Sequence, residues 1–295
     1  MVIPELFQKS RKNKMATYAL LENEQRARKR TCLAVDVPRV SDAITLAKEL
    51  SDLVDMMKVG KEIHTAACNE GIPIVSQMCQ YGAGVFLDLK FHDTPQTVYG
   101  AARAAAFLGV YMFNLHISGG EAMCRRAVDG AIKGAEERGI PRPKVIGVTE
   151  LTSLEQKDLD EQYGIDASGK SVVKYEDIVM RRTELAIKWG LDGVVCPANQ
   201  AGALQKSFPG WGGLYVTPGI EWGGKSGEGQ KQLYTPDKAV QDCRNSILVL
   251  GSAITKAGNI YEPDGKGGKK LIARGTVDDR RKAAYKILQA MAPFV

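Results

Sequence analysis

Short apolar segments recur at regular intervals along the chain, and longer segments with a helical spacing of apolar residues lie between them. Short apolar runs bounded by polar or glycine-containing turns are typical of buried strands. Eight strands are therefore expected, at residues 32–36, 56–60, 85–90, 111–116, 144–149, 192–196, 213–217 and 247–251. Helices are expected at about residues 16–28, 41–53, 61–70, 95–108, 119–137, 176–190, 198–206 and 277–291.

The alternation of strands and helices indicates an α/β fold with parallel strand pairing and right-handed crossovers. Eight strand–helix units within residues 31–295 predict one closed (β/α)₈ TIM barrel, preceded by an N-terminal extension over residues 1–30. A doubly wound open sheet is the alternative, although no Gly-x-Gly-x-x-Gly motif follows the first strand. Ser41 is expected to cap its helix, and the polar segments 154–175 and 257–275 are expected to be insertions.

The third expected strand ends in charged residues, and a helix begins directly after it. Asp88 and Lys90 are two residues apart, so in a strand their side chains point to the same side. Thr94 followed by Pro95 is typical of a helix N-terminus, which places Asp93 on the turn. Catalytic groups of parallel barrels collect at this edge. The alternative is a surface salt-bridge cluster, which contributes only about 0–1 kcal/mol per pair.

The first two expected strands carry charges at the same edge. Asp36 ends the first strand, and Lys58 lies within the second, where a lysine is costly unless it is paired or used. Adjacent strands bring these residues to one mouth of the barrel, together with the charges of the third strand. An alternating network of lysines and aspartates can hold itself together without a metal ion. A purely structural ion network that closes the barrel remains the alternative.

The glycine-rich loop after the seventh expected strand, residues 217–230, resembles a phosphate-binding loop. Its glycines expose backbone N–H groups, and Ser226 and Gln230 add side-chain donors. Barrels often hold phosphate groups with the loops after strands seven and eight. The alternative is a flexible lid without a ligand, and the two interpretations are compatible.

The three histidines do not match a metal-binding motif. His92 and His116 could lie near the barrel mouth and join Asp88 around a metal ion, whereas His64 stands apart. Their number and spacing fit no known metal motif, so no metal site is expected.

Composition narrows the class of protein. Apolar residues make up 44% of the chain and charged residues 25%, as in soluble globular proteins. The sequence contains no apolar run long enough for a membrane span and no apolar leader of the kind that directs secretion. A cytoplasmic location is therefore expected. The six scattered cysteines are expected to be free thiols.

The net charge of +6 includes basic runs at residues 9–14 and 26–30 without interleaved aromatic residues. These runs could contact nucleic acid or an acidic surface, but we expect them to be a solvated extension and helix, and therefore expect no nucleic-acid partner. A small anionic substrate fits the mild positive charge equally well.

Residues 86–97, Phe-Leu-Asp-Leu-Lys-Phe-His-Asp-Thr-Pro-Gln-Thr, closely resemble the signature of the orotidine 5′-monophosphate (OMP) decarboxylase family in its bacterial-type branch. The resemblance extends over about residues 31–256, through segments 34–36, 58–60, 148–153, 217–220 with Gln230, and 250–251. The Asp-x-Lys-x-x-Asp core alone is shared with related barrel decarboxylases and aldolases that act on sugar phosphates. The longer string and the Thr-Pro-Gly-Ile loop are more specific.

The resemblance implies a homodimeric barrel that converts OMP to uridine 5′-monophosphate (UMP) and CO₂ in de novo pyrimidine biosynthesis, with no metal or organic cofactor. It implies that Lys90 protonates C6 while Asp88 lies against the leaving carboxylate. Lys58 would position Asp88 and the ribose. Asp93 and Thr97 would reach the ribose and phosphate bound by the partner subunit.

The resemblance also assigns the remaining substrate contacts. Asp36 would bind the ribose, and Thr152 or Ser153 would meet the edge of the pyrimidine. The lid would contain Pro218 and Gln230. The backbone at Gly251 and Ser252 would face the phosphate.

Two positions depart from the family pattern. Ser252 stands where the family places a phosphate-binding arginine, and Glu221 stands where the bacterial branch commonly has another arginine. Lys225 or Lys256 could supply the missing charge, or the phosphate is held less well. A related sugar-phosphate decarboxylase or synthase, or a non-catalytic nucleotide-binding barrel, therefore stays open as an alternative function.

Overall fold

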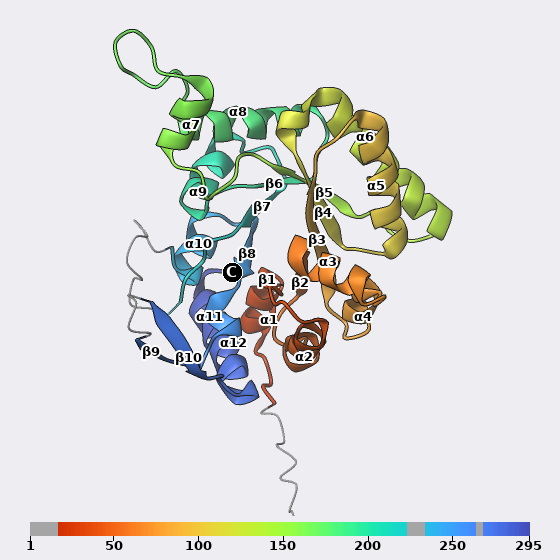
Figure 1. Cartoon of the computed structure of the whole chain (residues 1–295), viewed down its shortest axis with the longest axis vertical. Coiled ribbons are helices and arrows are strands. Elements are labelled where there is room, and N and C mark those ends of the chain that lie inside the picture. The colour runs from red at the N-terminus through yellow and green to blue at the C-terminus, as the bar shows by residue number, and fades with distance from the viewer. Residues whose placement is uncertain (1–16, 223–233, 264–267) are drawn as a thin grey trace, which may run out of the picture.

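The computed structural model describes residues 17–222, 234–263 and 268–295. Eight parallel strands close into a barrel in chain order, with β8 pairing to β1, and helices surround it (Figure 1). This arrangement confirms the predicted (β/α)₈ barrel and excludes the open sheet. The strands are β1 (Thr31–Ala34), β2 (Met56–Gly60), β3 (Gly84–Phe91), β4 (Met112–His116), β5 (Lys144–Val148), β6 (Gly193–Val195), β7 (Leu214–Thr217) and β8 (Ser246–Leu250).

The major helices lie where the spacing of apolar residues predicts them, within a few residues. They are α1 (Glu22–Arg28), α2 (Val40–Leu50), α3 (Lys61–Asn69), α5 (Pro95–Leu108), α6 (Gly120–Arg138), α8 (Tyr175–Lys188), α9 (Ala198–Ser207) and α12 (Val277–Met291). No helix of the described residues is long and apolar enough to cross a membrane.

Two predicted helix starts are wrong. The first helix begins at Glu22, because Leu21 before it is extended, with φ −67° and ψ 164°. Ser41 does not cap α2, which begins at Val40 after the extended residue Arg39. The Arg39 guanidinium binds the Asp42 carboxylate at 2.9–3.0 Å and fastens the first turn instead.

The two predicted insertions contain regular structure. Segment 154–175 includes α7 (Gln156–Tyr163). Segment 257–275 forms the antiparallel strands β9 (Ile260–Pro263) and β10 (Lys269–Ala273), beside α12 in Figure 1. Three short helices were not predicted: α4 (Ile74–Cys79), α10 (Pro236–Asp242) and α11 (Ser252–Thr255).

The barrel interior is filled by alternate residues of the strands, while the other set packs against the helices. The inward-facing apolar residues include Met56 on β2, Phe86 on β3 and Met112 on β4. Because side chains alternate along a strand, the inward positions two residues further on are Lys58, Asp88 and Asn114. These three polar side chains therefore form the layer directly above the apolar core, at the carboxyl ends of the strands.

Candidate active site

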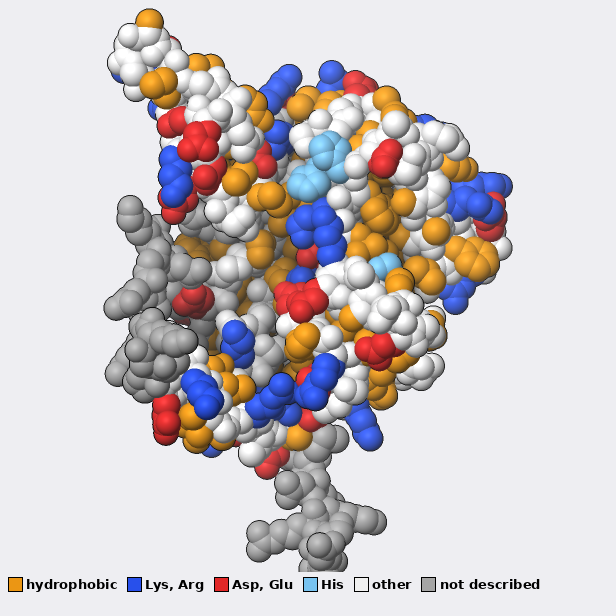
Figure 2. Space-filling view, viewed as in Figure 1, with side chains coloured by type: hydrophobic (Ala, Val, Ile, Leu, Met, Phe, Trp, Pro, Cys, Tyr) orange, Lys and Arg blue, Asp and Glu red, His pale blue; other side chains and the backbone are white. Residues whose placement is uncertain are grey.

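A cavity of about 380 Å³ opens at the carboxyl ends of the barrel strands. The molecule is hollowed on this side, and acidic, basic and histidine side chains lie along the rim (Figure 2). Apolar side chains from six strands form part of its lining: Ala34, Phe86, Val148, Val195, Val216 and Val249. The polar part of the lining comes from the ends of β1, β2 and β3 and from the loops after β5, β7 and β8.

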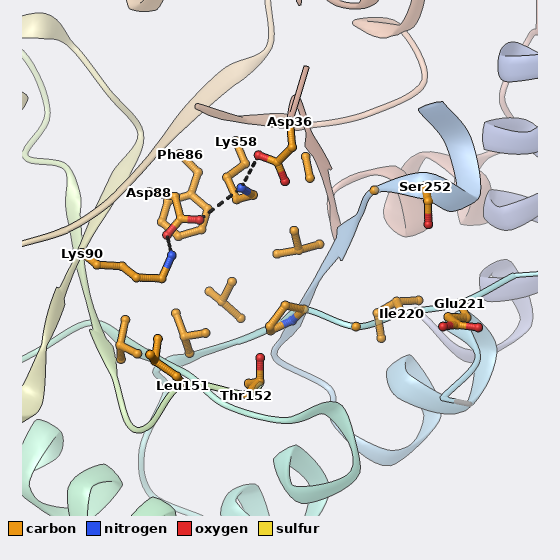
Figure 3. Close-up of a pocket in the computed structure, with 18 of the residues that line it drawn as sticks. Asp36, Lys58, Phe86, Asp88, Lys90, Leu151, Thr152, Ile220, Glu221 and Ser252 are labelled. Carbon is orange, nitrogen blue, oxygen red and sulfur yellow. Dashed lines mark hydrogen bonds and ion pairs between the residues drawn. The ribbon is translucent and has the colours of Figure 1, made fainter. Parts of the chain in front are cut away.

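Four charged residues form a continuous chain of ion pairs along one wall of this cavity (Figure 3). Lys58 Nζ lies 2.9 Å from Asp36 Oδ1 and 3.1 Å from Asp88 Oδ2. Lys90 Nζ lies 2.6 Å from Asp88 Oδ1. The predicted gathering of five charges at one mouth of the barrel is therefore confirmed for Asp36, Lys58, Asp88 and Lys90. Asp93, the fifth predicted member, does not line the cavity.

The absence of a side chain at Gly60 makes room for this network. A Cβ atom at that position would lie 3.0 Å from Asp36 Oδ1 and 3.2 Å from Lys58 Nζ. Gly60 ends β2 and pairs in register with Asp88 of β3. A larger residue there would push directly against the first ion pair.

Asn114, which the sequence pattern did not predict as a site residue, completes the network. Its Nδ2 donates to Asp88 Oδ1 at 2.6 Å, and its Oδ1 accepts the backbone N–H of Lys90 at 2.8 Å. Asn114 is fully buried on β4. It has no charge to mark it in the sequence, and the one available signal is its two-residue offset from the apolar Met112.

The backbone of Lys90 has a left-handed conformation, with φ of 52°. Such a conformation costs a non-glycine residue about 1–3 kcal/mol and is kept only where the surroundings impose it. The register of β3 against β4 shifts between Leu87 and Phe91, which brackets this residue. The hydrogen bond from Lys90 N to Asn114 therefore helps to hold a strained residue that carries its amine into the cavity.

The mutual pairing keeps the buried groups charged. Burial disfavours the charged form of Lys58, but the Asp88 and Asp36 carboxylates outweigh burial and raise its pKa above the ordinary value. Burial likewise disfavours the Asp88 carboxylate, but Lys58, Lys90 and Asn114 outweigh it and lower the pKa of Asp88. The site thus presents a fixed carboxylate between two ammonium groups, beside an apolar surface.

The two lysines differ in their access to a bound molecule. The Lys58 side chain is 11% exposed and contacts two carboxylates, whereas the Lys90 side chain is 26% exposed and contacts one. Lys90 is therefore the better placed of the two to give a proton to a ligand atom. Lys58 is better placed to orient Asp88 and Asp36.

The other predicted site residues divide into two groups. Thr152, Pro218, Gly251 and Ser252 line the cavity, as do Glu150 and Glu221. Asp93, Thr97 and Ser153 are exposed and do not line it. Asp93 accepts the backbone N–H of Thr94 at 2.6 Å, and the hydroxyl groups of Thr94 and Thr97 lie 2.9 Å apart. Gln230, like Ser226 and Lys225, lies outside the described residues.

His92 follows β3 and His116 ends β4, so the two residues lie at the carboxyl ends of neighbouring strands. The rings of His92 and His116 lie 5.3 Å apart between centroids. Within the described residues, no group of three or more histidine, cysteine, aspartate or glutamate side chains could hold a metal ion.

The chain is similar to known proteins over most of its length. The family model described as "Orotidine 5'-phosphate decarboxylase / HUMPS family" matches residues 29–262. Orotidine 5'-phosphate decarboxylase of Pseudomonas aeruginosa (strain LESB58) is 41% identical over 228 residues, covering 76% of this chain and 90% of that protein. The protein of the same name from Pseudomonas fluorescens (strain SBW25) is 40% identical over 228 residues, with the same two coverages of 76% and 90%.

Solved structures with a similar fold include a named decarboxylase and an uncharacterized protein. Orotidine 5'-phosphate decarboxylase from Lactobacillus acidophilus superposes with a TM-score of 0.68 at 30% identity, covering 89% of this chain and 99% of that chain. An uncharacterized conserved protein from Geobacillus kaustophilus superposes with a TM-score of 0.66 at 27% identity, covering 88% of this chain and 99% of that chain. Because the family model and these relatives match most of its length, the chain belongs to the orotidine 5'-phosphate decarboxylase / HUMPS family.

Proposed function

We propose that the protein decarboxylates OMP to UMP and CO₂ in de novo pyrimidine biosynthesis. The observation that carries this proposal is the Asp88 carboxylate held between Lys58 and Lys90, at 3.1 and 2.6 Å, on the wall of the cavity. Family membership and the identity to named decarboxylases support the choice of substrate.

The chemistry follows from the order of charges. A substrate carboxylate bound beside Asp88 meets a like charge, which disfavours the bound carboxylate relative to the transition state in which CO₂ departs. The electron pair of the breaking bond stays on C6 of the pyrimidine, where the ammonium groups stabilise the developing negative charge. Lys90 then transfers a proton to C6, which yields UMP, and its neutral amine takes a proton back from solvent.

The remaining lining residues fit the other parts of the nucleotide. Asp36 and Lys58 lie at one end of the network and would bind the ribose hydroxyls. Thr152 lines the cavity and Ser153 does not, which favours Thr152 as the contact to the pyrimidine edge. Pro218, Gly251 and Ser252 would surround the phosphate, with Gln230 of the loop after β7 as a further donor.

A homodimer with shared active sites would explain why Asp93 and Thr97 lie outside the cavity of their own subunit. Both side chains are exposed at the start of α5, beside the cavity-lining Lys90 in sequence but outside its own cavity. In a dimer they would reach the ribose and phosphate bound by the partner subunit. We expect such a dimer in the cytoplasm, acting without a metal or organic cofactor.

Replacing Lys90 with alanine tests the proposed chemistry directly. Lys90→Ala should abolish UMP formation from OMP, because the proton donor and one of the two charges beside Asp88 are lost, while the barrel stays folded. The exposed Lys48 of α2 gives a matched control, since Lys48→Ala should leave turnover unchanged. Chromatography of UMP and circular dichroism of both variants measure the two effects. Near-normal turnover by Lys90→Ala would show that the assigned role is wrong.

A further inference from the structure

The end of β5 is fastened to α8 by an ion pair that is almost fully buried. Arg182 Nη1 lies 2.6 Å from Glu150 Oε2, and the two side chains are 15% and 10% exposed. The same nitrogen donates to the carbonyl oxygen of Thr149 at 2.5 Å. Glu150 Oε1 accepts the backbone N–H of Leu151 at 3.0 Å. The pair therefore holds the backbone on both sides of Glu150, where β5 opens into the cavity.

A second contact from α8 holds the same segment. The hydroxyl of Tyr175, the first residue of α8, donates to the carbonyl oxygen of Leu151 at 3.2 Å. The Tyr175 side chain is buried, whereas Leu151 is exposed. Leu151 is thus held at its N–H through Glu150 and at its carbonyl by Tyr175. Leu151 and the adjacent Thr152 both line the cavity.

The charge of Glu150 also matters to an anionic ligand. Among the described lining residues, carboxylates outnumber ammonium groups: Asp36, Asp88, Glu150 and Glu221 against Lys58 and Lys90. OMP carries both a carboxylate and a phosphate, so further negative charge in the cavity weakens its binding. Arg182 on α8 does not line the cavity, but its ion pair with Glu150 neutralises the charge of that carboxylate.

We propose that Arg182 is a positioning residue for the decarboxylase reaction and the counter-ion of Glu150. It holds Leu151 and Thr152 in place against the pyrimidine, with help from Tyr175, and it removes one negative charge from the field that the substrate meets. This role rests on the proposed function for the identity of the substrate.

A double-mutant experiment tests the role of Arg182. Arg182→Met should lower kcat/KM for OMP by roughly 10- to 100-fold, because it leaves Glu150 as an unpaired buried charge facing the cavity. Most of this loss should lie in KM. Adding Glu150→Gln to Arg182→Met should restore part of kcat/KM, because the unpaired charge is gone. The loss caused by Arg182→Met should also be larger for the binding of UMP than for uridine, which lacks the phosphate charge.

A similar ion pair at the opposite end of β5 gives the control. Arg142 Nη2 lies 2.7 Å from Asp192 Oδ1, and Asp192 Oδ2 accepts the backbone N–H of Val145 at 2.7 Å. Arg142→Met should reduce thermal stability without changing KM or the ratio of UMP to uridine affinity. Arg182→Lys keeps the charge but not the guanidinium geometry, and it should preserve that ratio if Arg182→Met does not fold.

The outcomes separate this proposal from the proposed function. Turnover of OMP by the wild-type protein tests the proposed function alone. The role of Arg182 would be overturned if Arg182→Met, per folded molecule, kept kcat/KM within about twofold of wild type. It would also be overturned if the double variant were no better than Arg182→Met, or if Arg182→Lys lost the preference for UMP over uridine.

Discussion

Lys90 carries its amine into the cavity from a left-handed backbone conformation, with φ of 52°. Asn114 of β4 binds both the backbone N–H of Lys90 and the carboxylate of Asp88. One neutral side chain therefore fixes the relative position of the two groups that we propose act on the substrate. Preorganised charge of this kind is usually the largest contribution to enzymatic rate.

Asn114→Ala should lower kcat more than it raises KM, by roughly 10- to 100-fold, because Asp88 and Lys90 lose their common anchor. It should also destabilise the fold by about 1–3 kcal/mol, since the partly buried N–H of Lys90 loses its partner. Steady-state kinetics and urea denaturation measure the two effects. Asn245→Ala is the control, because its amide bonds the carbonyl of Gly213, at 3.4 Å, away from the cavity lining. An Asn114→Ala enzyme with normal kcat would contradict the anchoring role.

The charged residues of the site could be predicted from the sequence, whereas the residue that organises them could not. Asp36, Lys58, Asp88 and Lys90 stand out because charge at the end of an apolar strand is costly unless it is used. Asn114 has no such mark within its apolar strand. Asn114 is two residues after Met112, so its side chain faces the barrel interior as that of Met112 is observed to do. Its two hydrogen bonds depend on the local register shift of β3 against β4.

At the scale of elements, strong local signals gave accurate boundaries. Helix α5 spans Pro95–Leu108 as predicted, with proline in its first turn. Helix α12 spans Val277–Met291 as predicted, with Thr276 and Asp279 forming a capping box. Short elements carry too few residues for an apolar period to show, and α4, α10 and α11, with 6, 7 and 4 residues, were missed for that reason.

Helix α11 begins at Ser252, a lining residue of the cavity at the end where we expect the phosphate. The family resemblance places an arginine at this position. Ser252→Arg should lower KM for OMP by roughly 10-fold with little change in kcat, because a charged hydrogen bond to phosphate contributes about 1.5–3 kcal/mol.

Ser252→Met is the matched control for this change, since it adds length without charge and should give no gain. Steady-state kinetics of the two variants provide the comparison. An unchanged or higher KM for Ser252→Arg would mean that the native phosphate site is built from other groups.

At the scale of the whole molecule, the barrel follows from eight repeats of one pattern, and its closure brings distant residues such as Asp36 and Ser252 into one cavity. The sequence pattern alone did not assign Asp93 and Thr97 to a neighbouring subunit. That role came from the family resemblance, and their exposure outside their own cavity supports the proposed dimer.

Mixing two inactive variants tests the shared site. Lys90→Ala and Asp93→Ala, refolded together, should recover about a quarter of wild-type activity, because half of the dimers are mixed and each mixed dimer contains one intact site. Mixing Lys90→Ala with Lys58→Ala is the control and should recover nothing, since both residues belong to the same cavity. Absence of recovery in the first mixture, with dimers present by size-exclusion chromatography, would contradict shared sites.

The most direct test of the proposed decarboxylase is the ultraviolet absorbance of OMP incubated with the purified wild-type protein, with and without EDTA. Conversion to UMP lowers this absorbance, and we expect a rapid fall that EDTA does not change, with no fall for Lys90→Ala. A fall that EDTA abolishes would favour a related metal-dependent barrel enzyme. No fall with the wild-type protein, despite binding of UMP, would contradict the proposed activity and favour a non-catalytic nucleotide-binding barrel.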